Sequence, residues 1–208
     1  MNRLTKIACG VGGVVLGGLA LSWWSRPRPA KLPLLVMGDS IAVGVGRALE
    51  RLFPDQVVTL AREGECVRCT RDRVGDRLAQ GPRGGDIVLS TGTNSLDGSV
   101  STEDLVRQIS AIIQTLRESS STSRRVFYLA PPPAMNSSVL SEVQKENLRD
   151  LTVAVELGFR DVVSLWSIVG DEDGQGSFRS EYGTPGGLHP NQVGYEAIAQ
   201  AIMKGWVV

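Results

Sequence analysis

This chain of 208 residues lacks several features that common functions require. It has a single histidine, His189, and three cysteines, Cys9, Cys66 and Cys69. A zinc site needs about four ligands, and no second pair or histidine cluster accompanies Cys66 and Cys69, so the sequence predicts no bound metal. Lysine plus arginine number 22, as do aspartate plus glutamate, and the formal net charge is therefore zero. This balance argues against a strongly electrostatic nucleic-acid partner, which would require a basic excess.

The spacing Cys66-Val-Arg-Cys69 is compatible with more than one redox state. In an oxidising compartment the two cysteines would form a small disulfide or each pair elsewhere, whereas in a reducing compartment they would be plain thiols. The sequence does not decide between these states.

An uncharged run from Ile7 to Trp24 would be about 27 Å long as a helix, which is marginally enough to span a bilayer. We therefore expect residues 1–30 to be a signal anchor with a Pro-rich linker, and residues 31–208 to form one domain. The very short N-terminal tail favours a domain outside the cytoplasm, in the periplasm or at the cell surface. The alternative is a cleaved signal peptide, with Ala20 and Ser22 as the small residues at the cut, and a secreted domain.

The rest of the chain alternates between strand and helix patterns, which predicts an α/β fold. Right-handed crossovers then favour a flavodoxin-like three-layer α/β/α sandwich with a five-stranded parallel sheet. The expected strands are 32–38, 56–61, 86–92, 124–130 and 160–166, and the expected helices are 41–53, 71–80, 102–119, 138–158 and 191–206.

Four polar or glycine positions follow strands of this predicted sheet or precede its last helix: Ser40, Gly64, Asn94 and His189. Each has an ordinary structural interpretation by itself, such as a helix cap, a loop glycine or a turn residue. In a doubly wound sheet, however, the carboxyl ends of the strands share one edge, so all four are expected to meet there. A serine nucleophile, a histidine base, a glycine N–H and an asparagine amide are the groups that acyl transfer needs.

Four ordered blocks of the sequence resemble the motifs of the SGNH, or GDSL-type, hydrolase superfamily. The blocks are VMGDSIAVG at 36–44, Gly64, STGTNSL at 90–96 and GLHPNQVGYEAIA at 187–199, and the resemblance runs from about Leu32 to the C-terminus.

The resemblance implies a role for each matching residue. Ser40 would attack an ester carbonyl, and His189 would take the serine proton and pass it to the leaving alcohol. The oxyanion would be held by the N–H groups of Ser40 and Gly64 and by the side-chain amide of Asn94. Asp39 would be a structural hydrogen-bond partner, and no metal or organic cofactor is implied.

Gly186 departs from the family pattern, in which an aspartate three residues before the histidine orients the imidazole. Loss of such a carboxylate costs about 10⁴-fold in rate where a triad depends on it. Three explanations stay open: a Ser-His dyad whose ring is held by a backbone carbonyl, a substitute carboxylate, or an impaired enzyme. The candidate substitutes lie in the preceding loop, at Asp171, Glu172, Asp173 and Glu181.

We therefore expect a membrane-tethered carboxylic ester hydrolase acting on an acylated glycan or lipid, with acetylated envelope polysaccharide as the first hypothesis. A lysophospholipase or lipase-like esterase is the nearest alternative. A catalytically impaired envelope-binding or lysis-associated protein is the alternative from another class. The glycine-rich stretch 166–187 is either a lid beside the site or a surface loop.

Overall fold

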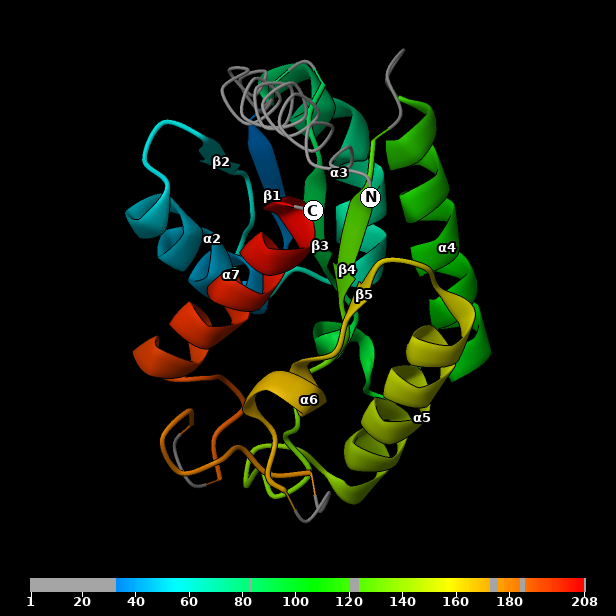
Figure 1. Cartoon of the computed structure of the whole chain (residues 1–208). Helices are drawn as coiled ribbons and strands as arrows, with labels where there is room; N and C mark the ends of the chain where they lie inside the picture. Colours follow the sequence, from blue (N-terminus) through cyan, green and yellow to red (C-terminus); the bar gives the residue numbers. More distant parts are fainter. Residues whose placement is uncertain (1–32, 83, 120–123, 173–175, 184–185, 208) are drawn as a thin grey trace, which may run out of the picture. The chain divides into compact units, whose positions relative to one another are not determined.

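Five parallel strands form one sheet in the order β2-β1-β3-β4-β5 (Figure 1). The computed structural model describes residues 33–207, apart from 83, 120–123, 173–175 and 184–185. The expected five-stranded parallel α/β sheet is confirmed, and its order is that of flavodoxin-like folds. The strands are β1 (Leu34–Gly38), β2 (Val57–Thr59), β3 (Ile87–Ser90), β4 (Val126–Leu129) and β5 (Val162–Val163).

Helices cover both faces of this sheet, with α2 and α7 on one side and α3 and α4 on the other (Figure 1). A single 3-10 turn, η1 (Thr93–Ser95), follows β3. The helices are α2 (Ser40–Leu52), α3 (Val67–Gln80), α4 (Thr102–Glu118), α5 (Glu142–Gly158), α6 (Leu165–Val169) and α7 (Gln192–Val207).

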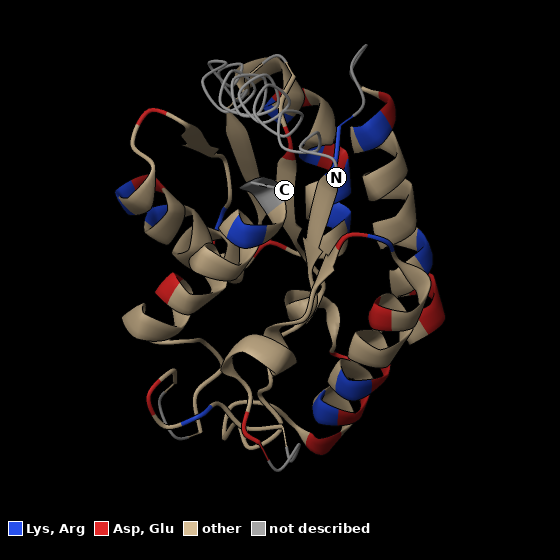
Figure 2. Ribbon diagram, viewed as in Figure 1, with Lys and Arg blue, Asp and Glu red and all other residues tan. Residues whose placement is uncertain are grey.

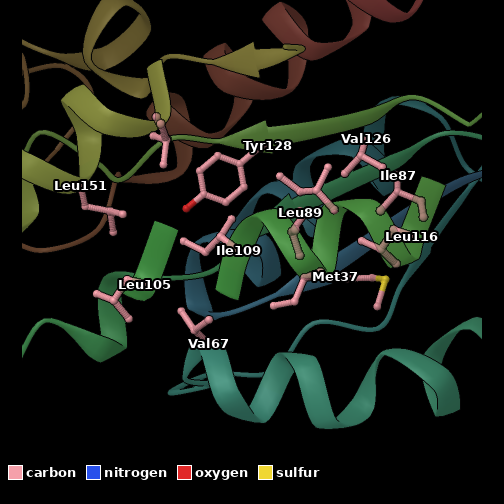
Figure 3. Packing of buried hydrophobic residues seen from close by; sticks show 14 of the residues in the cluster. Met37, Val67, Ile87, Leu89, Leu105, Ile109, Leu116, Val126, Tyr128 and Leu151 are labelled. Carbon is pink, nitrogen blue, oxygen red and sulfur yellow. The ribbon is translucent and has the colours of Figure 1, made fainter. Parts of the chain in front are cut away.

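The two faces of the sheet are separate hydrophobic cores because successive side chains of a strand point to opposite sides. Along β1, Leu35 and Met37 join the core beneath α3, α4 and α5, whereas Leu34 and Val36 join the core beneath α2 and α7. Figure 3 shows the first core, where strand side chains meet Leu105 and Ile109 of α4.

Three element boundaries differ from the sequence prediction because a polar side chain caps a helix there. Helix α3 begins at Val67, four residues early, because Cys66 caps it. Helix α5 begins only at Glu142, after a capping box formed by Ser141 and Gln144. The predicted strand at 160–166 is wrong beyond Val163, because the Ser164 side chain caps the short helix α6.

Charged side chains lie on the helices and loops, whereas none of the five strands carries one (Figure 2). This distribution is expected of a parallel sheet that is covered on both faces. The charged groups that could take part in chemistry therefore lie outside the strands, on the helices and loops.

Gly38 lets β1 and β3 approach each other closely at their carboxyl ends. Its φ of +125° favours glycine, and a Cβ at this position would lie 1.6 Å from the Ser90 carbonyl oxygen. The Asp39 N–H donates to that same oxygen at 2.9 Å. The glycine of the Gly-Asp-Ser block is thus a packing requirement that sets where the next two residues lie.

The signal anchor expected at 1–30 lies outside the described residues, as does the domain boundary after it. Within the described part of the chain, no helix is long and apolar enough to cross a membrane.

Candidate active site

Ser40 is the first residue of α2, directly after the carboxyl end of β1. The helix cap is not Ser40 but Asp39, whose Oδ1 accepts from the Ile41 N–H at 3.1 Å. The Ser40 hydroxyl is therefore not needed for capping. It lies at a helix N-terminus, where free N–H groups and the helix dipole favour a developing negative charge.

His189 reaches this serine from the segment before α7. The Ser40 Oγ and the His189 Nε2 are 2.7 Å apart, a hydrogen-bond distance. With the ring proton on Nδ1, Nε2 accepts the hydroxyl proton, which is the arrangement for general-base activation of a serine. The structure thus brings together two residues that are 149 positions apart in the chain.

The backbone that follows His189 is held by hydrogen bonds and a β-bridge. Asn191 caps α7 by accepting from the Gly194 N–H at 2.9 Å, and its own N–H donates to the Tyr182 carbonyl at 2.8 Å. Pro190 forms a β-bridge with Gly183. These contacts hold the backbone that carries His189, while its ring is hydrogen-bonded to Ser40.

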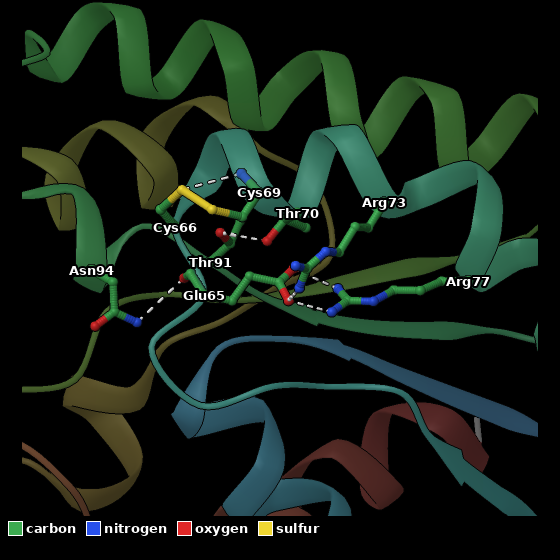
Figure 4. Close-up of polar contacts among 8 residues, drawn as sticks. All are labelled: Glu65, Cys66, Cys69, Thr70, Arg73, Arg77, Thr91 and Asn94. Carbon is green, nitrogen blue, oxygen red and sulfur yellow. Dashed lines mark hydrogen bonds and ion pairs between the residues drawn. A yellow bond between two sulfur atoms is a disulfide. The ribbon is translucent and has the colours of Figure 1, made fainter.

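Gly64 and Asn94, the other two residues expected in the site, lie on neighbouring loops. Gly64 follows β2 with a φ of +70°, and a Cβ added to it would meet nothing within 4 Å. The Asn94 side chain, on η1, donates from Nδ2 to the Glu65 carbonyl at 3.3 Å (Figure 4). An amide nitrogen carries two protons, so this bond orients Asn94 and leaves one donor for a ligand.

Asp39 is fully buried beneath these loops and supports them. Its Oδ1 also accepts from the Ser90 hydroxyl at 2.9 Å, while Oδ2 has no hydrogen-bond partner among the described residues. Burial raises the pKa of Asp39 to about 6, although the hydrogen bond from Ser90 opposes the shift. This supports the structural role that the sequence predicted for Asp39.

Gly186 adopts a φ of +70°, and its carbonyl accepts from the Ser138 N–H at 3.1 Å. A Cβ at this position would have Ser138 and Asn136 as its nearest neighbours, at 3.5 Å and beyond. The backbone carbonyl of Gly186 is therefore already engaged by the loop after β4.

The carboxylates expected to replace the missing aspartate are not hydrogen-bonded to His189 in the described structure. Asp171 accepts instead from the Ser177 N–H at 3.2 Å, while Glu172 and Glu181 are exposed. Asp173 lies outside the described residues.

Glu63 is the carboxylate that acts electrostatically on His189, and the sequence reasoning missed it. Burial lowers the pKa of His189 below its usual 6.5, and the charge of Glu63 opposes this shift. Glu63 immediately precedes Gly64, so the loop after β2 carries it toward the histidine. Its position after the second strand was the available signal, because that loop borders the same edge of the sheet.

Cys66 and Cys69 form a disulfide across the first turn of α3 (Figure 4). Their Cα atoms are 5.1 Å apart, and both side chains are half-buried. The structure therefore contains the small disulfide that the sequence left as one of two states.

A cavity of about 230 Å³ lies beside the segment that leads to His189. It separates the loop after β4 from the second half of the glycine-rich stretch, and serine, glycine and asparagine residues make up most of its lining. The lining includes Ala134, Asn136, Ser137, Ser177, Phe178 and Gly186.

Residues 36–197 match the model of the GDSL-like lipase/acylhydrolase family. The chain belongs to this family. The match includes all four positions that the sequence singled out, and family membership supports an ester hydrolase. No curated protein matches the sequence.

Solved structures similar to this GDSL-family chain share its fold at low sequence identity. A GDSL-like lipase from Bacteroides thetaiotaomicron is 16% identical, with a TM-score of 0.68 over 93% of this chain and 96% of that one. A lipase/acylhydrolase from Enterococcus faecalis is 18% identical, with a TM-score of 0.59 over 84% and 95%. The catalytic domain of the Streptococcus pneumoniae peptidoglycan O-acetyltransferase A is 14% identical, with a TM-score of 0.56 over 84% and 92%.

The buried carboxyl of Asp39 is expected to make folding stability depend on pH. Its pKa is raised from 3.8 to about 6, so the folded state binds a proton more tightly than the unfolded state. The stability it contributes is fully present below pH 3.8 and is lost as pH rises through about 6, by about 3 kcal/mol. Asp39→Asn should flatten this dependence, measured by urea unfolding between pH 4 and 7.

Asp72→Asn, on the exposed surface of α3, is the matched control and should leave the pH dependence as in the wild type. An Asp39→Asn protein with an undiminished pH dependence would contradict the prediction.

Proposed function

We propose that this protein is a serine esterase that hydrolyses a carboxylic ester through Ser40 and His189. The observation that carries the proposal is the 2.7 Å hydrogen bond between Ser40 Oγ and His189 Nε2 at the N-terminus of α2. Family membership supports the reaction class. A catalytically impaired binding protein is the weaker interpretation, because a degraded site would have no reason to retain this pair.

The proposed reaction runs in two stages with water as the second substrate. Ser40 Oγ attacks the ester carbonyl carbon while His189 Nε2 takes the hydroxyl proton, and the tetrahedral intermediate expels the alcohol as His189 returns that proton. Water, activated by the same imidazole, then attacks the acyl-serine ester and releases the carboxylic acid. The N–H groups of Ser40 and Gly64 and the free proton of Asn94 Nδ2 stabilise the oxyanion in both stages.

We propose further that the pair works as a dyad with a distant charge rather than as a triad. The capped and bridged backbone around His189 fixes the ring, a task that the missing aspartate would share. Glu63 supplies the negative charge that favours the imidazolium formed in the transition state.

A short acyl group on a glycan is the substrate that we favour. The small cavity beside the segment that leads to His189 supports a compact group rather than a long acyl chain, since ligand pockets are usually about 300–1,000 Å³. A peptidoglycan O-acetyltransferase domain has a similar fold, so the fold accommodates acetyl chemistry at a glycan. Residues 1–30 would tether the domain outside the cytoplasm, and the disulfide supports an oxidising compartment.

Ser40→Ala and His189→Ala should each lower kcat for p-nitrophenyl acetate hydrolysis by about 10³-fold or more, because each removes a group that acts in the transition state. A fluorophosphonate probe should label the wild type at Ser40, as read by mass spectrometry. Circular dichroism should show that both variants stay folded. Absence of both labelling and hydrolysis in the wild type would refute the enzyme proposal.

The pH dependence of kcat/KM tests whether the carboxylate that influences His189 is Glu63 or one in the glycine-rich stretch. The acid limb of kcat/KM should have its midpoint below pH 6.5, because the pKa of the base His189 is lowered. Glu63→Gln should move this limb to still lower pH and decrease kcat by up to about fivefold, since the imidazolium loses a favourable charge.

Asp171→Asn and Glu181→Gln serve as matched controls that should leave the limb in place. A shift caused by either of these, with none caused by Glu63→Gln, would instead support a substitute carboxylate in the glycine-rich stretch.

Acyl-chain preference tests the substrate class and its nearest alternative. The kcat/KM for p-nitrophenyl acetate should exceed that for the octanoate ester by about tenfold or more, because the cavity is small. Release of acetate from O-acetylated peptidoglycan, measured beside fatty-acid release from lysophosphatidylcholine, extends the comparison to natural esters. Faster turnover of the octanoate ester and of the lysolipid would favour the lysophospholipase interpretation.

A further inference from the structure

We propose that the Cys66–Cys69 disulfide positions the oxyanion hole, so that its reduction lowers the rate of ester hydrolysis. The inference rests on the proposed function, because it concerns donors that the esterase reaction uses. It assigns to two cysteines a role in turnover that is separate from that of Ser40 and His189.

Gly64 has no packing of its own to fix the direction of its N–H. A Cβ added to it would meet nothing within 4 Å, and the residue is exposed. On its N-terminal side the chain is tied where the Arg62 N–H donates to the Gly38 carbonyl at 2.8 Å. On its C-terminal side the first fixed points are Glu65 and the disulfide, so these determine the orientation of Gly64.

The Glu65 side chain is anchored inside the molecule by two arginines of α3. It is buried and accepts from Arg77 Nη1 at 2.7 Å, and Arg73 Nη1 lies 3.5 Å from it (Figure 4). The backbone carbonyl of the same residue accepts from Asn94 Nδ2 at 3.3 Å. Glu65 therefore connects the loop that holds Gly64 with the side chain of Asn94, another of the proposed oxyanion donors.

The disulfide fixes the turn that carries this connection. Cys66 caps α3, with its Sγ accepting from the Cys69 N–H at 3.1 Å, and the covalent bond closes the same turn. The next residue, Val67, donates its N–H to Ser95 Oγ at 3.1 Å, directly beside Asn94. A change in the first turn of α3 would therefore reach both loops that hold the oxyanion donors.

Reduction would change the geometry and the charge of this turn. A thiolate of an added dithiol attacks one sulfur, the second thiolate displaces the mixed disulfide, and two protein thiols and the oxidised dithiol result. Both sulfurs belong to half-buried residues, which leaves an approach for the reductant. The freed Cys66 lies at a helix N-terminus, which favours its thiolate. That negative charge would oppose an oxyanion bound by Gly64, which precedes Cys66 by two residues in the sequence.

The test compares oxidised and dithiothreitol-reduced protein in a Cys9→Ser background, which prevents exchange with the third cysteine. We expect kcat for p-nitrophenyl acetate to fall about tenfold on reduction, below the 10²–10³-fold loss typical when one oxyanion donor is removed. KM should be unchanged. Reoxidation should restore the rate.

Cys66→Ser/Cys69→Ser is the matched variant, because serine retains the helix cap but cannot form the bond. It should have a kcat below that of the oxidised protein and should not respond to dithiothreitol. Asn94→Ala completes a double-mutant cycle. If the disulfide acts through the same oxyanion hole as Asn94, reduction should lower kcat by a smaller factor in this variant than in the wild type.

Equal kcat in the oxidised and reduced proteins would overturn the inference and leave the esterase proposal intact. Fully multiplicative effects of reduction and Asn94→Ala would also overturn it, because the disulfide would then act elsewhere. Failure of the oxidised wild type to hydrolyse esters or to label at Ser40 would refute the proposed function itself.

Discussion

The close approach of β1 and β3 at Gly38 is the constraint on which the candidate site depends. With no room for a Cβ beside the Ser90 carbonyl, the two strand ends are drawn together by the Asp39 N–H and enclose the Asp39 side chain. That enclosure makes Asp39 the cap of α2 and leaves Ser40 as the first helical residue, with a hydroxyl that is not used for capping. The position of the proposed nucleophile is thus a consequence of backbone packing, and the raised pKa of Asp39 is its electrostatic cost.

The sequence predicted those parts of the site that follow from topology. Ser40, Gly64 and Asn94 each come after a strand, and parallel strands end at a common edge, so periodicity alone predicts that they lie at that edge. Glu63 was not singled out as the charge beside His189, because its position after the second strand places it near the shared edge but its approach to the ring depends on how the loop folds. Helix α6 was missed because Leu165 and Trp166 continue an apolar strand-like run, and only the cap from Ser164 decides the conformation.

An orienting aspartate in a triad has two separable tasks, and this chain assigns them to different residues. The backbone that carries His189 is held through the Asn191 cap and the bridge between Gly183 and Pro190, and we propose that this keeps the ring in place. Charge complementarity falls to Glu63, which is exposed and therefore screened by water more than a buried carboxylate would be. A dyad of this kind would keep the position of the imidazole but stabilise the imidazolium less strongly than a triad does. Gly186 is therefore compatible with a working active site.

The two halves of the site are consequently held by different forces. The half with His189 depends on hydrogen bonds and packing near the start of α7, which no redox change reaches directly. The half with Gly64 depends on a loop that is anchored by the buried Glu65 ion pair and closed by a covalent bond. Hydrolysis as proposed needs both halves, whereas the hydrogen bond between Ser40 and His189 needs only the half with His189. A change in the oxidation state of the disulfide would therefore alter transition-state stabilisation while that hydrogen bond stays formed.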